Sequence, residues 1–575
     1  MASESLPSQQ PATADADAPI VEQKSGLLSG RKRRDAAEAL LAYALLFPAL
    51  LIIFVFGIFP LGFSIYESTL TGLNKIVGRY TGLDNYVKAI GNLAYVLAFW
   101  IAAVFIYLAF RRIQDAIKLG REREEQTLYW VPAAIASGTA IALAARFVFT
   151  LLPHMLRIPE QIPRGQELTP ELFRQLLGEA WRMPDVQSAL WAMLIVGVIA
   201  IALIVLTNRL VPHQTHWGDY LSNFMQSTLF IIGAAALGYL AFTEVQKAYT
   251  LALETGESPT IWTELIVISA GAVLLILSYL LWRGADQAQS TTRMLLRIGG
   301  ALALAIGAWV FIAELPAAIA AGNDDWWESL LNTVYFAMFT IPLQFGISLA
   351  MASILFMNLR GQSTFRVIYF LPYIAPLVGT AAAFRIIFSA RANAPINSLL
   401  TSIGLQPLSW LNEPTGIFQM MLGKSVDLPI WLAGPSLALF TIVLYNVWAY
   451  VGFDIVIFLA GLGNIPNELY EAASIDGSGR WQQFRHITLP MLSPTIYFLM
   501  LLAVIGTFKA FNHIYVLREG AALGTTDTAS VLIFQTFNRD TRYGYASALA
   551  ILLLIIVTVL TVINNKVGER RVFYG

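Results

Sequence analysis

The chain has 575 residues; 57% are hydrophobic, 13% are charged, and the formal net charge at pH 7 is zero. Soluble domains carry about 25% charged residues, so much of this surface must face lipid, and the charge balance gives no support for binding to nucleic acid. The chain has no cysteine, which excludes disulfides and thiol catalysis, and its five histidines form no HExxH-type cluster. We therefore expect neither a metal ion nor another cofactor.

The first 30 residues are rich in Ala, Ser, Pro, Gln and acidic residues, and they lack the basic-then-apolar order of a secretory signal. We interpret 1–35 as a disordered tail that contains the basic cluster RKRR at 31–34. The tail is followed by stretches of about 20 apolar residues, the length that crosses a bilayer as a helix. Twelve such stretches predict an all-α, polytopic membrane protein: 40–66, 91–110, 128–152, 189–207, 224–243, 262–282, 298–320, 328–356, 366–389, 435–460, 491–516 and 544–565.

Basic loops indicate the orientation, because Lys and Arg favour the cytoplasmic side of a membrane. The RKRR cluster and the loop RRIQDAIKLGREREEQ (111–126) fall on the same side when the spans alternate. The loop 283–297 on that side is also basic, whereas 208–223 has only Arg209. We predict that both termini are cytoplasmic, together with the loop before the eleventh stretch.

That loop contains ELYEAASIDGSGRWQQFRHITLP (468–490), a polar segment between two apolar runs. Good helix formers follow Asn467, which we expect to act as the N-cap of a short helix. Gly477 permits a sharp bend, because glycine adopts positive φ freely. A second short helix should then lead to Pro490, whose missing N–H is harmless where a helix begins. The pattern predicts a bent helix pair, although an ordinary amphipathic connector would have a similar composition.

The spacing E-A-A, three residues, G, nine residues, I-x-L-P resembles the cytoplasmic EAA loop of the membrane subunits of ATP-binding-cassette importers. GLDNYVKAI (82–90), WWESLLNTVYFAMF (326–339), TFRVIYFLPYIAP (364–376) and GERRVFYG (568–575) look like the carbohydrate-uptake, maltose-type branch of that family. The resemblance implies that the loop, 461–490, docks on an ATPase subunit and transmits its closure to the spans. The matching positions are Glu471, Ala472, Ala473, Gly477, Ile487, Leu489 and Pro490.

The resemblance covers 36–90, the first part of a six-helix permease core, and 323–575, its main part. Relatives lack most of 91–322, which we interpret as an inserted hydrophobic region of unknown role. It contains six of the twelve apolar stretches, and an even number returns the chain to the outer side, as the core requires. We hypothesise an accessory bundle that buttresses the assembly or contacts another subunit; alternatively, its outer segment 153–188 contacts a solute-binding protein.

The resemblance also implies the partners and the location. They are a second permease subunit in a heterodimer, two ATP-binding-cassette ATPase subunits, an extracytoplasmic solute-binding protein, a sugar-like solute and the lipid of a prokaryotic inner membrane. The chain has no GxxxxGK[ST] motif, so it is not expected to be an enzyme, and ATP hydrolysis would belong to its partners.

Two spans flanking the loop carry candidate substrate-lining residues. Asn446, Tyr450 and Phe453 recur at i, i+4 and i+7 and so share one helix face. By resemblance, these residues together with Gly506 and Thr507 align near the sugar-lining positions of the family. The alternative for each is helix–helix packing. Asp454 and Lys509 are charges within spans, for which a cavity-lining or paired role competes with snorkelling to the interface.

Two other classes of function compete with the importer subunit. A self-contained secondary transporter would also suit twelve spans with both ends inside, but we find no repeat between the halves and it would leave the loop unexplained. An intramembrane enzyme would need clustered His, Asp or Glu residues within spans, and few are present.

Overall fold

A computed structural model describes residues 30–71, 78–162, 169–211, 216–256, 261–285, 290–312, 319, 321–357, 361–423 and 428–571. The part of the predicted tail at 1–29 lies outside the described residues, as do parts of the segments 153–188, 208–223 and 283–297. The chain divides into two units, 1–62 and 63–575. The described elements are mainly helices long and apolar enough to cross a membrane, as the sequence predicts.

The first unit is one long apolar helix. It consists of α1 (Gly30–Ile53), a π-helical turn η1 (Phe54–Ile58) and the start of α2 (Phe59–Glu67). The π-turn precedes Pro60, which has no N–H to continue the regular hydrogen-bond ladder. Every side chain from 41 to 58 is exposed, so within its own unit this helix has no protein covering for its apolar surface.

The second unit begins with a small structure built around the GLDNY segment. Strands β1 (Leu70–Thr71) and β2 (Arg79–Tyr80) pair antiparallel, with Leu70 opposite Tyr80. Helix α3 (Asp84–Ile90) follows. The buried Asn85 amide donates to the carbonyls of Ser68 and Leu70, each at 2.8 Å, so this asparagine fixes the turn of the chain.

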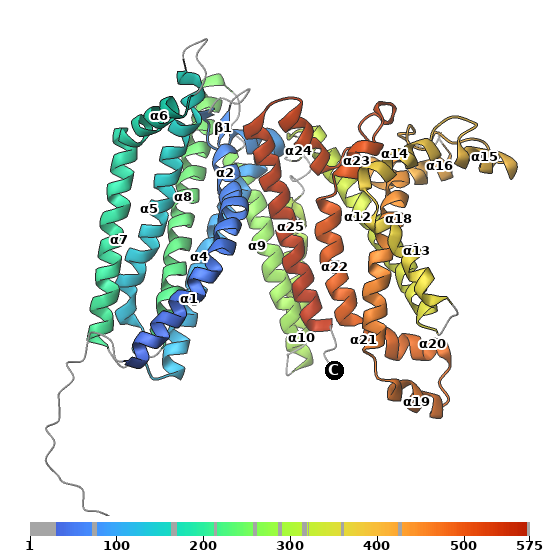
Figure 1. Ribbon diagram of the computed structural model, residues 1–575, viewed down its shortest axis with the longest axis horizontal. Coiled ribbons are helices and arrows are strands. Elements are labelled where there is room, and N and C mark those ends of the chain that lie inside the picture. Colours follow the sequence, from blue (N-terminus) through green and yellow to red (C-terminus); the bar gives the residue numbers. More distant parts are fainter. Residues whose placement is uncertain are drawn as a thin grey trace, which may run out of the picture. The chain divides into compact units, whose positions relative to one another are not determined.

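The inserted region contains six helices of spanning length, which confirms the predicted number within the described residues. Helix α4 runs beside α8, and α5 packs against both α7 and α8, as Figure 1 shows; α9 pairs with α10. Small residues permit these close contacts: Ala133 and Ala134 are fully buried beside Trp130. The elements are α4 (Leu93–Glu122), η2 (Leu128–Trp130), α5 (Val131–Leu156), η3 (Ile158–Gln161), α6 (Pro170–Arg182), α7 (Pro184–Leu210), α8 (Trp217–Thr255), α9 (Ile261–Ala285) and α10 (Thr291–Ile312).

The first and last residues of this region lie next to each other in space. The Asn323 N–H donates to the Ala89 carbonyl at 3.1 Å. A Cβ built on Gly322 would lie 2.8 Å from the same carbonyl oxygen, so the segment that ends at Ala89 and the segment that begins at Gly322 are in contact. The ends of the inserted region are therefore adjacent in space, although more than 200 residues separate them in sequence.

The remaining helices lie in 323–575, the part that the resemblance assigns to the main permease core, and this part is called the permease half. In it, α12 packs along α18 and α13 crosses α18. The crossing is close: a Cβ on Gly452 would lie 1.8 Å from the Tyr369 carbonyl oxygen. The elements are α12 (Asp324–Phe356), α13 (Gln362–Ile374), α14 (Leu377–Ile387), α15 (Pro395–Ser402), α16 (Ile417–Leu422), α17 (Ile430–Ala433), α18 (Leu437–Gly463), α19 (Asn467–Ile475), α20 (Arg480–Gln483), η4 (Phe484–Thr488), α21 (Leu489–Met491), α22 (Ser493–Phe508), α23 (Asn512–Leu517), η5 (Gly520–Ala522), α24 (Ala529–Asn538) and α25 (Tyr543–Arg571).

Two of the predicted spans are broken rather than straight. The stretch 366–389 forms α13 and α14, which meet at 95° beside Pro376, where Ala375 is extended as residues before proline prefer. The stretch 491–516 was expected as one helix, but α22 ends at Phe508 and α23 starts at Asn512. The described residues hold ten unbroken candidate spans and two bent pairs, α13 with α14 and the segment Arg480–Met491 with α22, which make up to twelve spans if each pair counts as one.

Candidate functional site

A polar cavity of about 210 Å³ lies between α12, α18, α22 and α23. Helices α12 and α18 are the main packed pair of the permease half, so two of its walls belong to the rigid core. Apolar residues from 377 to 511 complete the lining. The polar lining residues are Gln344, Asn446, Tyr450, Asp454, Thr507, Lys509, Asn512 and His513.

All five residues predicted to line a substrate path lie on this cavity. Asn446 is buried and Tyr450 and Phe453 are half-buried on one face of α18, as their spacing indicates. Gly506 is exposed and Thr507 is buried near the end of α22. The structure therefore brings together two groups that lie about 55 residues apart in the chain.

The cavity wall contains a chain of side-chain hydrogen bonds that joins α18 to α12. Gln344 Nε2 donates to Asp454 Oδ2 at 2.7 Å, and Asn446 Nδ2 approaches Gln344 Oε1 at 3.5 Å. Asp454 is 3% exposed and Gln344 is 7% exposed. Sequence reasoning missed Gln344, and the only available signal was an amide side chain within the apolar stretch 328–356.

Aromatic rings stand beside these polar groups. Tyr373 of α13 stacks on Phe453 with ring centroids 5.0 Å apart and meets Tyr450 edge-on at 5.9 Å. Lys509, at the end of α22, is exposed and makes no ion pair among the described residues. The cavity thus offers hydrogen-bond acceptors, donors and ring faces together, the combination that binds a polar ligand with an apolar face.

A larger cavity of about 800 Å³ lies between α12, α22 and α25, and its chemistry is different. Its walls are almost entirely aliphatic and aromatic; Asn564 and two tryptophans supply their few polar atoms. A hydroxyl-bearing ligand would lose its hydrogen bonds to water there and gain few in return. The smaller cavity is therefore the better candidate for a polar solute.

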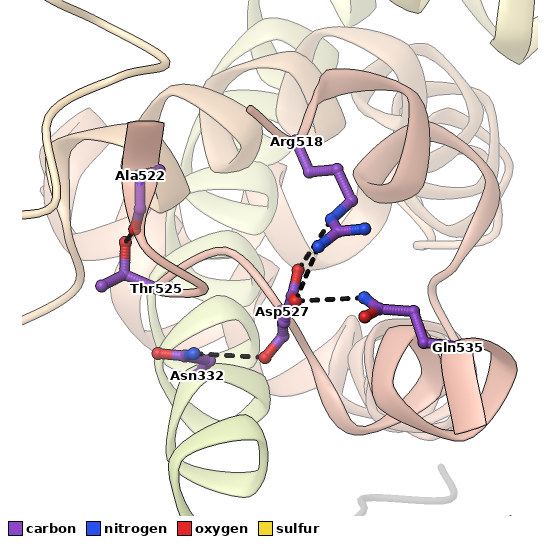
Figure 2. Close-up of polar contacts among 6 residues, drawn as sticks. All are labelled: Asn332, Arg518, Ala522, Thr525, Asp527 and Gln535. Atoms are coloured by element: carbon purple, nitrogen blue, oxygen red, sulfur yellow. Dashed lines mark hydrogen bonds and ion pairs between the residues drawn. The ribbon is translucent and has the colours of Figure 1, made fainter. Parts of the chain in front are cut away.

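The loop between α23 and α24 holds the α23 wall of the polar cavity in place. Arg518, directly after α23, makes two hydrogen bonds of 2.9 Å to the Asp527 carboxylate, and Gln535 donates to the same group at 3.0 Å. Asn332 of α12 donates to the Asp527 carbonyl at 3.1 Å, so three elements converge on one residue (Figure 2). Thr525 folds back onto the Ala522 carbonyl within the loop.

The loop 461–490 forms the predicted bent helix pair. Helix α19 ends at Ile475, and Gly477 has φ +76°, the left-handed conformation that closes a helix. The Ser478 N–H donates back to Ala473 at 2.9 Å. The prediction that Asn467 is the N-cap is wrong: Pro466 holds that position with an extended backbone (φ −60°, ψ 132°), and Asn467 is the first helical residue.

Side chains tie the two arms of the bend together. Gln483 Nε2 donates to Ser474 Oγ at 2.9 Å, and the Tyr470 hydroxyl bonds Thr488 at 2.9 Å. Of the predicted coupling positions, Ala473 and Ile487 are half-buried and line a hollow of about 400 Å³ beside Gly477. The others are exposed: Glu471, Ala472, Gly477, Leu489 and Pro490.

The bend also presents apolar side chains to the surroundings. Ile475 is 88% exposed at the end of α19, and Trp481 is 70% exposed at the start of α20, stacked on Phe484 at 5.6 Å. Ala472, a small residue, is exposed as well, so its side chain would not keep another protein at a distance. A fixed bend with apolar tips is a shape that fits a groove on another protein.

Known proteins resemble the permease half of this chain. Residues 314–573 match the family described as the inner membrane component of binding-protein-dependent transport systems. A probable ABC transporter permease protein of Bacillus subtilis, YesP, is 35% identical over 44% of this chain and 75% of its own length. The trehalose/maltose permease protein MalF of Thermococcus litoralis is 32% identical over 43% and 76%, and the arabinooligosaccharides permease protein AraP of B. subtilis is 31% identical over 43% and 74%.

These relatives are membrane subunits of larger transporters, so a self-contained secondary transporter is not favoured. The spans and the family agree on a multi-pass protein of a prokaryotic inner membrane. The chain belongs to the family of permease subunits that form the inner membrane component of binding-protein-dependent transport systems.

Proposed function

We propose that this permease subunit carries a sugar or a related polyhydroxylated solute through the polar cavity between α12, α18, α22 and α23. The observation that supports this most is the convergence of Asn446, Tyr450, Phe453, Gly506 and Thr507 on one cavity that combines acceptors with ring faces. A pyranose has polar edges and an apolar face, so it needs both. The relatives named for trehalose, maltose and arabinooligosaccharides support the same solute class.

The substrate path is tested by replacing Tyr450 with Ala in the assembled transporter. Tyr450→Ala should lower the uptake of labelled maltose or trehalose at least about tenfold, because a ring face and a hydroxyl are lost from the cavity wall. Tyr279→Ala on α9 is the control, because this tyrosine is 56% exposed and does not line the cavity. Equal uptake by the two variants, at equal expression, would remove Tyr450 from the path.

We further propose that the bend at 461–490 couples the spans to an ATPase, which hydrolyses ATP on behalf of this subunit. The bend is rigid, because Gln483 and Tyr470 link its two arms, and its tips are apolar and exposed. The inferred complex has a second permease subunit, two ATPase subunits and an extracytoplasmic binding protein. Both termini and this bend then lie in the cytoplasm, as the basic loops indicate.

The coupling role is tested by co-purification with the ATPase. Glu471→Arg should reduce ATPase recovery and abolish substrate-stimulated ATP hydrolysis, because it places a bulky cation where the motif has a carboxylate. Glu468→Arg, one turn earlier on the same exposed helix, is the control. Equal loss in both variants would mean that the charge of α19 matters, and not the motif position.

We also infer that 91–322 is an insertion into a six-helix core that comprises 36–90 and 323–575. The contact between Ala89 and Asn323 supports this, because the core continues across it without the inserted residues. The region is then an accessory membrane bundle attached at the outer side of the permease.

A further inference from the structure

We propose that Asp454 contacts the solute directly and, held by Gln344, selects uncharged or amino-bearing sugars over anionic ones. This inference rests on the proposed sugar transport and adds a specificity to it. The sequence did not single out Gln344, and it gave Asp454 a cavity-lining or paired role without a contact to solute. Both line the same cavity as the five residues predicted to line the substrate path.

The geometry of Gln344 leaves one carboxylate oxygen of Asp454 available. Gln344 uses both ends of its amide, donating to Asp454 Oδ2 at 2.7 Å and facing Asn446 Nδ2 at 3.5 Å. These contacts fix the carboxylate between α12 and α18. Among the described residues, nothing donates to Asp454 Oδ1, although the residue is 3% exposed and lines the cavity.

A carboxylate oxygen can only accept hydrogen bonds, so whatever satisfies Asp454 Oδ1 must be a donor. Sugar hydroxyls and ammonium groups are donors, whereas a sugar carboxylate or phosphate is not. Asn446 adds a second acceptor, because its Oδ1 also has no partner among the described residues. The free oxygens of Asp454 and Asn446 can therefore bind O–H or N–H groups of a solute.

The charges around the cavity are arranged unequally. Asp454 is buried, so solvent screens its field weakly, whereas the Lys509 ammonium is exposed and its field is strongly screened. The third ionisable lining residue, His513, is enclosed by the rings of Phe336 and Tyr445. An anion that reached Asp454 would meet a like charge in a poorly hydrated site, and such juxtapositions are how proteins reject a competing ligand.

The test compares three probes that share one ring: D-glucose, D-glucosamine and D-glucuronate. Their binding to the purified, assembled transporter without its binding protein is measured by ligand-observed NMR, which detects weak complexes. Asp454→Asn removes the charge but keeps an oxygen that accepts from Gln344, so the link between α12 and α18 survives. Asp324→Asn, an exposed aspartate in the first turn of α12, is the matched control.

We expect the unmodified transporter and the Asp324→Asn control to bind glucuronate at least about tenfold more weakly than glucose, the size of one charge-assisted hydrogen bond. Asp454→Asn should weaken glucose binding and bring the glucose and glucuronate affinities to within about threefold of each other. Its thermal midpoint should stay close to that of the control, which separates a contact with solute from a purely structural role.

Two results would overturn this inference alone. One is the same glucose-to-glucuronate ratio before and after Asp454→Asn. The other is the absence of binding by all three probes to a transporter that takes up maltose or trehalose. If no neutral sugar is taken up at all, the proposed function itself fails, and that outcome is read from uptake and not from the NMR ratio.

Discussion

The inserted region, 91–322, has six spanning helices without a break, whereas two spans of the permease half, 323–575, bend by 63° and 95°. Bends release backbone groups that lipid cannot satisfy, so they are tolerated only where protein or a water-filled cavity surrounds them. The 95° bend between α13 and α14 adjoins Leu377, which lines the polar cavity, whereas the 63° bend lies at Leu492, where the loop 461–490 leads into α22.

Charged side chains are placed differently in the two regions. In the insert, the ion pairs Arg123–Asp219 and His154–Asp185 join helix ends, and the buried Glu244 pairs with Lys247 one turn later on the same helix. In the permease half, the hydrogen bond between Gln344 and Asp454 lies inside the helix pair. Buried polar groups are costly in a membrane and usually functional. The proposed transport path lies in the permease half, where this buried carboxylate joins two helices.

The largest effect is expected from Gly452→Ala, which tests whether the permease half is the tightly constrained region. The new Cβ would meet the Tyr369 carbonyl oxygen at 1.8 Å, and backbone cannot move aside cheaply. We expect a loss of at least about 3 kcal/mol in the free energy of unfolding, or failure to fold. Gly197→Ala on α7 meets nothing within 4 Å and should leave the thermal midpoint unchanged. Equal midpoints for both variants would contradict the comparison.

The next effect concerns the clamp around Asp527. Arg518→Met should lower the free energy of unfolding by about 2 kcal/mol, because it leaves a partly buried carboxylate with only Gln535 as a side-chain donor. It should also lower solute uptake, since Arg518 anchors the α23 wall of the cavity. Thermal melting and uptake measure the two consequences. Arg539→Met, at an exposed pair on the same side, is the control.

A smaller effect is expected from removing the insert. Joining Ile90 to Gly322 should give a chain that assembles and transports within about twofold of the full protein, because inserted domains usually fold as separate units. The measurement is uptake per assembled transporter. Loss of assembly would show that the bundle buttresses the complex, and selective loss of stimulation by the binding protein would favour a role for 153–188.

The smallest effect is expected within the insert itself. Arg123→Ala breaks the 2.8 Å pair with Asp219, whose carboxylate is about half exposed, and should change the thermal midpoint least of these variants, because exposed ion pairs contribute little to stability. Raising the salt concentration should shrink the difference further, because exposed charges are screened. A loss as large as that of Arg518→Met would contradict the contrast between the regions.

The sequence was sufficient where one local rule decides the structure. Apolar length predicted the spans, and Gly477 predicted the bend between α19 and α20, since its positive φ is a property of glycine. The spacing of Asn446, Tyr450 and Phe453 placed them on one face of α18. The prediction that Gly506 and Thr507 lie near that face rested on the family resemblance, because no local sequence pattern shows which helices pack together.

Tertiary contacts decide what the sequence did not predict. Gln344 lies about 100 residues before its partners, so only the packing of α12 on α18 shows what its amide does. The breaks at Ala375 and Lys509 are hidden in stretches whose hydrophobicity is continuous. Asn467 is a good N-cap residue by type, but Pro466 before it already has the extended backbone that the cap position requires.

The contact between Ala89 and Asn323 has a consequence for synthesis. At 5–20 residues per second, a ribosome needs roughly 10–50 s to make the chain between these two residues. During that interval α3 has none of its later neighbours α12 and α25. Leu83 and Tyr95 pack in one cluster with Val245 of α8, so once α8 is made we expect the insert to hold α3 in place until the rest of the permease is translated.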